Sequence, residues 1–124
     1  MTTFRTVAEI VIGVLYAIGA GRQALYVVRH SHEFYSDMAD RAWISPAKSF
    51  IGKVLLPNSV LITVLVAVFQ AAVAIAILTR GPWAGPALVA GGVFSIAGAL
   101  TGSRAETVGF GILAAIHFWL AFSI

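Results

Sequence analysis

The chain has 124 residues, of which 60% are hydrophobic and only 10% are charged, whereas about a quarter are charged in an ordinary soluble domain. So little charge cannot cover the surface of a water-soluble protein. The length suits one domain rather than a nucleotide-binding domain followed by a substrate domain. The net charge of +3 is spread between apolar runs, so we expect no nucleic-acid partner. The absence of cysteine excludes disulfide exchange, thiolate nucleophiles and iron–sulfur ligation.

Four apolar runs approach the roughly 20 residues that a membrane-spanning helix needs. They cover about residues 6–28, 60–79, 83–102 and 108–124. The first run has no small-residue cleavage pattern, which favours a retained anchor over a signal peptide. Short loops join the last three runs, so neighbouring helices should be antiparallel. The sequence therefore predicts an all-α fold, a four-helix transmembrane bundle that forms a single membrane domain over residues 1–124.

The first run contains GAGRQA at residues 19–24, which matches the G-x-G-x-x-A turn of dinucleotide-binding proteins. That turn needs a preceding β-strand and an acidic residue about 20 positions on, at the end of a second strand. Asp40 has roughly that spacing, but it lies in an amphipathic helical segment. We therefore interpret Gly19 and Gly21 as helix-packing residues rather than as a cofactor site.

The segment 33–56, between the first and second spans, predicts one or two short helices at the membrane surface. At about 100° per residue, Glu33, Asp37 and Asp40 share one arc with nearby polar residues. Apolar residues such as Phe34 and Tyr35 occupy the rest of the circumference. A second helix is expected to start with Ser45 as its N-cap before Pro46 and to stop at Pro57, and Asn58 or Ser59 is expected to cap the second span.

The basic residues are unevenly divided between the two ends of the predicted bundle. One end, formed by the long loop between the first two runs and the loop between the last two, holds five of them: Arg29, Arg41, Lys48, Lys53 and Arg104. The other end, formed by the N-terminus and the loop between the second and third runs, holds two: Arg5 and Arg80. Lys and Arg are enriched in cytoplasmic loops. The sequence thus predicts that the long loop faces the cytoplasm and that both termini lie outside.

Polar residues on all four spans fall at related depths. At about 1.5 Å rise per residue, they lie roughly 9 to 18 Å from the face that carries the long loop. Polar groups at such depth usually face the bundle interior, a partner or a wet cavity. The sequence predicts an interhelical polar pocket formed by Tyr16, Arg22, Gln70, Ser95 and His117. The alternative is that Arg22 extends to the headgroups while the others bond across helices or to the backbone.

No set of residues points to a metal, a haem group or a catalytic centre. His30 and His32 stand two apart and would face different directions on a helix, and His117 lies about 14 Å deeper in the bundle. Glu9 is expected to lie alone near the opposite face. We therefore expect no cofactor, metal ligand or catalytic residue. Glycines and alanines at spacings of four, such as Gly98 and Gly102, favour close helix packing.

The order of these features resembles the DoxX-like family of small four-helix membrane proteins. The resemblance rests on Gly19 and Gly21 followed by Arg22, the Phe34–Tyr35 pair, the segment from Asn58–Ser59 to Phe69–Gln70, and the apolar run closed by Arg80–Gly81. Arg22 and Gln70 stand where better-known members often carry Lys and Glu. The family takes its name from a small subunit of a terminal quinol oxidase linked to thiosulfate:quinone oxidoreduction. The resemblance implies a non-catalytic accessory subunit of a membrane redox or envelope complex.

We thus expect an integral protein of the plasma (inner) membrane of a bacterium, whose partners are the lipid bilayer and subunits of a membrane complex. The alternative function is a small carrier of a lipid, quinone or solute, which would be a homo-oligomer because four helices rarely enclose a pathway. A membrane enzyme acting on an apolar substrate comes third. Tyr16, Glu9 and His117 would be its proton donors, but they form no defined catalytic constellation.

Overall fold

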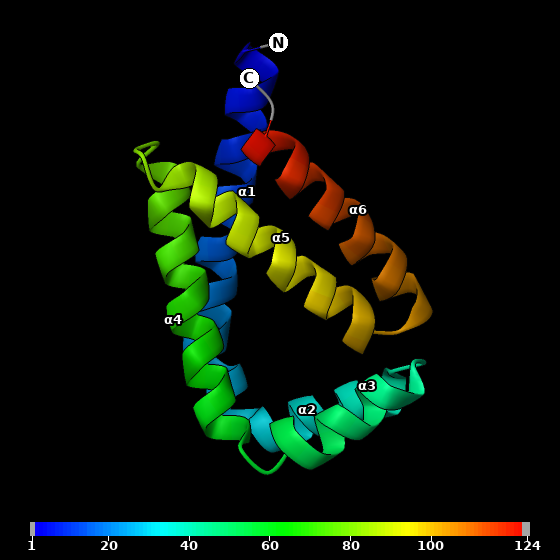
Figure 1. Ribbon diagram of the computed structural model, residues 1–124. Coiled ribbons are helices and arrows are strands. Elements are labelled where there is room, and N and C mark those ends of the chain that lie inside the picture. Colours follow the sequence, from blue (N-terminus) through cyan, green and yellow to red (C-terminus); the bar gives the residue numbers. More distant parts are fainter. Residues whose placement is uncertain (1, 123–124) are drawn as a thin grey trace.

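The computed structural model describes residues 2–122, and the ordered elements in this range are helices (Figure 1). Four of these helices are long and apolar enough to cross a membrane, which confirms the predicted all-α four-helix bundle. They are α1 (Thr2–Leu25), α4 (Ser59–Leu78), α5 (Ala84–Thr101) and α6 (Arg104–Phe122). Shorter helices connect the first two of them: the 3-10 turn η1 (Val27–His30), α2 (Ser31–Arg41), α3 (Ser45–Phe50) and the π-helical turn η2 (Ile51–Leu55).

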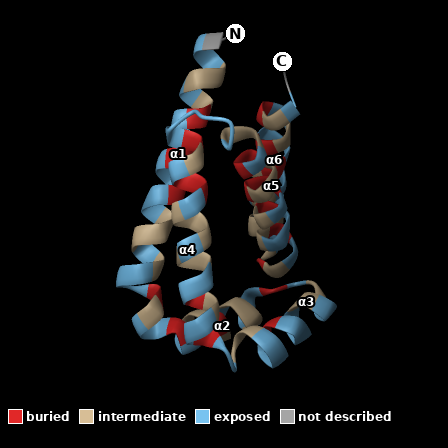
Figure 2. Ribbon diagram, turned by 60° about the vertical axis from the view of Figure 1, so that its left-hand side comes forward, coloured by how far each residue is buried: buried red, intermediate tan, exposed pale blue. Residues whose placement is uncertain are grey.

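The four long helices form two antiparallel pairs. Helix α1 packs mainly against α4, and α5 packs mainly against α6, while α4 and α5 provide a smaller contact between the pairs. Figures 1 and 2 show the N-terminal end of α1 and the C-terminal end of α6 at the same end of the molecule, with α2 and α3 across the other end. We call α2, α3 and η2 together the platform.

The outer surface of the long helices is apolar, as expected of a protein in lipid. Large hydrophobic side chains such as Val68, Ile75 and Ile112 are more than half exposed. The interior contains a compact core that includes Ile12, Tyr16, Val73, Ala74, Ile77, Ala87, Leu88 and Leu120. Exposed apolar helices of this length are stable in a bilayer because every backbone group of a helix is hydrogen-bonded within it. The chain is therefore an integral membrane protein.

The ends of the long helices follow from local sequence, with differences of a few residues from the predicted spans. The first long helix ends at Leu25 rather than near residue 28, because the chain tightens into the 3-10 turn η1. Helix α4 ends before Arg80, which takes a left-handed conformation with φ of 54° ahead of Gly81 and Pro82. Residues 123 and 124, the expected end of the fourth span, lie outside the described residues.

The segment 103–107, predicted to be a loop, is mostly helical. The Ser103 amide donates to Glu106 Oε1 at 3.0 Å, and the Glu106 amide donates to Ser103 Oγ at 3.3 Å. This reciprocal arrangement is a capping box, which satisfies amides that would otherwise lack partners at a helix start. Helix α6 therefore begins at Arg104, earlier than predicted.

The platform has its own small core and agrees with the predicted amphipathic pattern. Tyr35, Ala42 and Ile51 are buried in it, whereas Glu33 and Asp37 are exposed. Burial raises the pKa of the Tyr35 hydroxyl above its ordinary value, and a hydrogen bond with the Thr63 side chain partly offsets this. Tyr35 thus keeps its proton at physiological pH.

The predicted helix caps in this region are displaced. Ile44, not Ser45, precedes α3, because the Lys48 amide bonds to the Ile44 carbonyl at 2.9 Å. Asn58 does stand at the N-cap position of α4, but its amide group donates to the Val54 carbonyl at 2.9 Å instead of capping. Ser59 Oγ accepts a hydrogen bond from Ser31 Oγ at 3.0 Å, which ties the start of α2 to the start of α4.

Candidate binding cavity between the helix pairs

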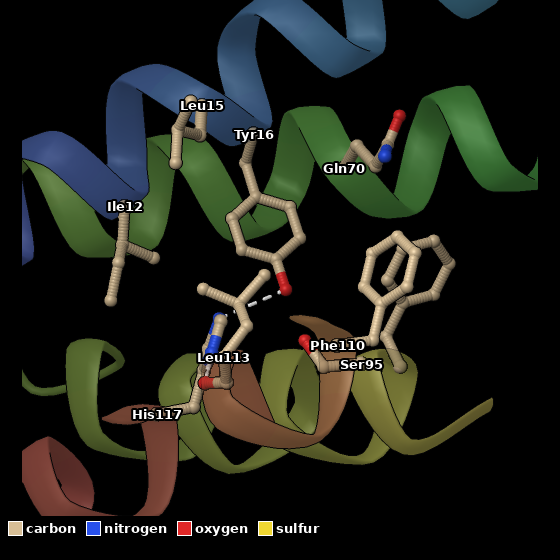
Figure 3. A pocket seen from close by; sticks show the side chains of 9 residues that line it. Ile12, Leu15, Tyr16, Gln70, Ser95, Phe110, Leu113 and His117 are labelled. Atoms are coloured by element: carbon tan, nitrogen blue, oxygen red, sulfur yellow. Dashed lines mark hydrogen bonds between the residues drawn. The ribbon is translucent and has the colours of Figure 1, made fainter. Parts of the chain in front are cut away.

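A hydrogen-bonded cluster joins the two helix pairs near the middle of the bundle. The Tyr16 hydroxyl of α1 lies 3.0 Å from His117 Nε2 of α6 and 3.1 Å from the Gly91 carbonyl oxygen of α5. Ser95 Oγ donates to the same carbonyl at 2.9 Å. Tyr16, Ser95 and His117 are all buried. Three of the four long helices therefore meet through polar groups at one place (Figure 3).

The position of the proton on His117 follows from its second ring nitrogen. His117 Nδ1 lies 2.7 Å from the Leu113 carbonyl oxygen one turn earlier in α6. A carbonyl only accepts hydrogen bonds, so Nδ1 carries a proton. In the neutral imidazole, Nε2 is then an acceptor that faces the Tyr16 hydroxyl. This arrangement fixes both the tautomer and the orientation of the ring.

Gly91 makes the close approach of these side chains possible. A Cβ atom built on Gly91 would lie 2.6 Å from the Tyr16 hydroxyl oxygen and 2.7 Å from His117 Cδ2. The neighbouring Gly92 is similarly close to the Phe118 ring, at 2.7 Å. Small residues at helix interfaces of membrane proteins allow this kind of backbone approach. The predicted glycine position Gly98 has a looser contact, 3.2 Å from the Phe110 ring.

The cluster lines a cavity of about 250 Å³ between the helix pairs. The remaining walls are mainly apolar and aromatic, and the lining residues are Ile12, Leu15, Tyr16, Gln70, Phe94, Ser95, Phe110, Leu113 and His117 (Figure 3). Leu15 lines the cavity and is also 52% exposed on the outside of α1. Because that outer surface lies within the predicted span, the cavity adjoins the lipid on this side.

Gln70 contributes an unusual polar group to the α4 wall. Its Oε1 atom is buried and has no hydrogen-bond partner within the described residues. The amide group packs against α1, since a Cβ atom on Gly19 would lie 2.9 Å from Nε2 and 3.1 Å from Oε1. A buried acceptor without a donor carries a free-energy cost of about 1–3 kcal/mol. The carbonyl side of this amide is enclosed between α4 and α1 and does not face the cavity (Figure 3).

Four of the five residues expected to form a polar pocket line this cavity: Tyr16, Gln70, Ser95 and His117. Arg22 does not line it. The Arg22 side chain is exposed at the platform end of α1, and its guanidinium carbon lies 6.0 Å from the centre of the Phe34 ring. The reason is the length of the arginine side chain, which lets the charge reach the membrane interface instead of the bundle interior.

Glu9 is not alone, contrary to the expectation from sequence. Its carboxylate lies 3.4 Å from Arg5 Nε and 3.3 Å from Arg80 Nη1. Arg5 also donates to the Leu120 carbonyl of α6. The Glu9 cluster therefore joins α1, the α4–α5 turn and the end of α6. The spacing of Arg5 and Glu9 by four residues was a local signal for one ion pair, whereas the partner 71 positions away required the fold.

Sequence reasoning overlooked Gly91 and the pairing of Glu9 with Arg80. The Gly91–Gly92 doublet one turn before Ser95 was the available signal for the first. Within residues 2–122, no group of three or more His, Asp or Glu side chains is placed to hold a metal ion. The polar groups that line the cavity are hydroxyl, imidazole and amide groups in a mainly apolar wall.

No protein-family model matches the sequence, and comparisons with curated proteins and with solved structures give no significant match.

Proposed function

We propose that the chain is a non-catalytic accessory subunit of a membrane redox or envelope complex, and that its interhelical cavity holds a small molecule with an apolar body and a polar group. The observation that carries this proposal is the buried Tyr16–Ser95–His117 cluster in the wall of a mainly apolar cavity. Binding sites for small molecules commonly combine apolar walls with a few placed polar groups.

The size and position of the cavity support a ligand taken from the bilayer. A cavity of about 150 Å³ is enough for benzene, so the 250 Å³ here can hold a ring with a short substituent. Leu15 both lines the cavity and is 52% exposed, so the cavity lies close to the lipid-facing surface of α1.

The accessory role itself rests on the resemblance to the DoxX-like family, and so does placement in the plasma (inner) membrane of a bacterium. A subunit of this kind would contact its partner through the lipid-facing surfaces of the long helices. The ligand would then be a structural or regulatory component of the complex rather than a substrate.

The test is affinity purification of the full chain in mild detergent, followed by native mass spectrometry of the recovered proteins and small molecules. We expect a different membrane subunit and a bound apolar molecule with the wild type. Tyr16→Phe removes the hydroxyl from the cavity and should reduce ligand recovery about fivefold. Tyr26→Phe is the matched control, because Tyr26 is exposed and outside the cavity. A monomer without protein partner or ligand would contradict the proposal.

A second candidate function is a small oligomeric carrier of a lipid, quinone or solute. It is favoured by a groove of about 410 Å³ on the α1–α4 pair, lined by Ala17, Ala20, Ala71, Ala74, Ile75, Leu78 and Thr79. Four alanines let a further helix approach closely. A homo-oligomer in native lipid together with ligand flux into vesicles would favour the carrier, whereas a mixed complex without flux would favour the accessory subunit.

A further inference from the structure

The chain itself holds α3 and η2 at one surface of the bilayer. The two elements follow each other without a break, and the membrane-spanning α4 begins at Ser59, shortly after η2 ends at Leu55 (Figure 1). The connection is tight, because the Leu56 amide bonds to the Ile51 carbonyl at 2.8 Å and the Asn58 amide bonds to the Leu55 carbonyl at 3.2 Å. Even a fully extended chain of this length spans only about 14 Å. The end of η2 therefore lies at the membrane interface.

The outer face of this helical segment is apolar. Ile51 is buried in the core of the platform and Leu55 packs against that core, whereas Phe50 is 50% exposed and Val54 is 41% exposed. Residues four apart lie on the same face of a helix, so Phe50 and Val54 form an exposed apolar strip. A helix at a membrane surface buries such a strip at the boundary of the headgroups and the acyl chains.

The same segment carries positive charge that nothing in the described chain neutralises. Residues 42–58 include Lys48 and Lys53 but no Asp or Glu. Both lysines are exposed, and neither takes part in an ion pair among residues 2–122. Arg41 of the platform differs, because it pairs with Glu106 at 3.4 Å. The two ammonium groups are therefore available to an anionic partner.

An anionic phospholipid matches both features of the segment at once. Its acyl chains cover the apolar strip, and its headgroup carries the negative charge that the lysines lack. A lysine side chain is long enough to keep its stem along apolar surface while its ammonium group reaches the headgroups. Lys and Arg residues beside a membrane attract anionic lipids in this way. An acidic protein would supply the charge but would not cover an apolar strip at the level of the lipid.

We infer that α3 and η2 form a binding surface for anionic phospholipids. Lys48 and Lys53 contact the phosphate groups of the lipids, and Phe50 and Val54 enter the acyl region. This surface is separate from the interhelical cavity and does not depend on its ligand.

The first test uses the full chain in nanodiscs that contain equal amounts of phosphatidylcholine and phosphatidylglycerol. Native mass spectrometry counts the lipids of each kind that stay on the released protein. We expect the wild type to retain phosphatidylglycerol about tenfold better than phosphatidylcholine. The double variant Lys48→Gln with Lys53→Gln should lose most of this preference. Lys48→Arg with Lys53→Arg is the matched control, because it keeps both charges, and it should retain lipids like the wild type.

The second test locates the apolar strip, and it is simple to label because the chain has no cysteine. Phe50→Cys and Gly52→Cys are each labelled with bimane and placed in nanodiscs that contain brominated lipids, which quench the fluorophore on contact. At about 100° per residue these two positions point to nearly opposite sides of a helix. We expect quenching at position 50 to exceed quenching at position 52, and brominated phosphatidylglycerol to quench position 50 more than brominated phosphatidylcholine does.

Equal retention of the two lipids by the wild type would overturn the inference. An unchanged preference in the folded glutamine double variant would overturn it too, because the lysines would then not select the lipid. Equal quenching at positions 50 and 52 would show that the strip does not enter the acyl region and would leave a protein as its partner. If the glutamine variant does not fold, lipid retention by the wild type and the quenching pair still decide the question.

Discussion

At the scale of single residues, the close approach at Gly91 links the packing of the bundle to the chemistry of the cavity. The Tyr16 hydroxyl and the His117 ring occupy the space that a side chain at this position would need. Helix α5 has little room to shift away from these side chains, because its Gly92 also packs closely against Phe118 of α6. Substitution at Gly91 should therefore disturb both stability and ligand binding.

Gly91→Ala is expected to lower the thermal stability of the protein and to reduce cavity binding at least tenfold. Overpacking in a protein core typically costs about 1–3 kcal/mol, and here it displaces the Tyr16–His117 hydrogen bond. Gly111→Ala is the matched control, because nothing lies within 4 Å of a Cβ atom at Gly111 in the middle of α6. That variant should be neutral or slightly stabilising. The measurement is thermal unfolding in detergent together with recovery of the co-purifying apolar molecule, and equal stability of both variants would contradict the proposed packing.

The depth of polar residues along predicted spans identified four side chains that line the cavity, but it misplaced Arg22. Depth is fixed by the rise of a helix and can be counted from sequence. The direction of a long flexible side chain depends on what surrounds the helix, here Phe34 of the platform. Gly91 was overlooked because many glycines and alanines occur in this chain, and their spacing alone does not show which of them lie at a helix contact.

At the scale of helices, the platform is connected to the α5–α6 turn by a cluster around Trp43. The Trp43 indole donates from Nε1 to Thr107 Oγ1 at 2.8 Å, and the Arg104 guanidinium carbon lies 5.3 Å from the centre of the indole ring. Arg41 pairs with Glu106 at 3.4 Å beside it. These contacts join α6 to the platform, which also packs against α4 and, through α3, against α5.

Trp43→Ala should release the start of α6 from the platform. The lost hydrogen bond and cation–π contact together correspond to about 1 kcal/mol, or about fivefold faster local amide exchange. Hydrogen exchange with mass spectrometry should detect this in peptides covering residues 102–107. Trp83→Ala provides the control, because Trp83 is 71% exposed in the α4–α5 turn at the other end. Unchanged exchange in the Trp43 variant would show that the platform does not restrain α6.

The helices themselves were predictable because apolar runs of sufficient length have few alternatives in a membrane. Their exact ends depended on local hydrogen bonds such as the Ser103–Glu106 capping box. This box is a recognisable sequence pattern, but the prediction assigned the segment to a loop. The association of Glu9 with Arg80 was different. It joins residues of α1 and the α4–α5 turn, and no local pattern indicates which distant arginine a buried carboxylate will meet.

At the scale of the whole molecule, the two ends of the bundle differ in their number of basic residues. The platform end carries six Lys or Arg residues: Arg22, Arg29, Arg41, Lys48, Lys53 and Arg104. The other end carries two, Arg5 and Arg80. Both residues of the smaller group pair with Glu9. Because basic residues are retained on the cytoplasmic side, we propose that the platform faces the cytoplasm and that both termini lie outside.

Single cysteines provide a direct test of this orientation, since the natural chain has no cysteine that would react. Gly52→Cys in η2 and Gly81→Cys in the α4–α5 turn place a thiol at opposite ends, at exposed positions where nothing lies within 4 Å of a Cβ atom. In bacterial spheroplasts, a membrane-impermeant maleimide should label the Gly81→Cys variant at least tenfold faster than the Gly52→Cys variant. After permeabilisation both should react at similar rates. Faster labelling of Gly52→Cys in sealed spheroplasts would reverse the orientation, and equal labelling there would show that the charge asymmetry does not set it.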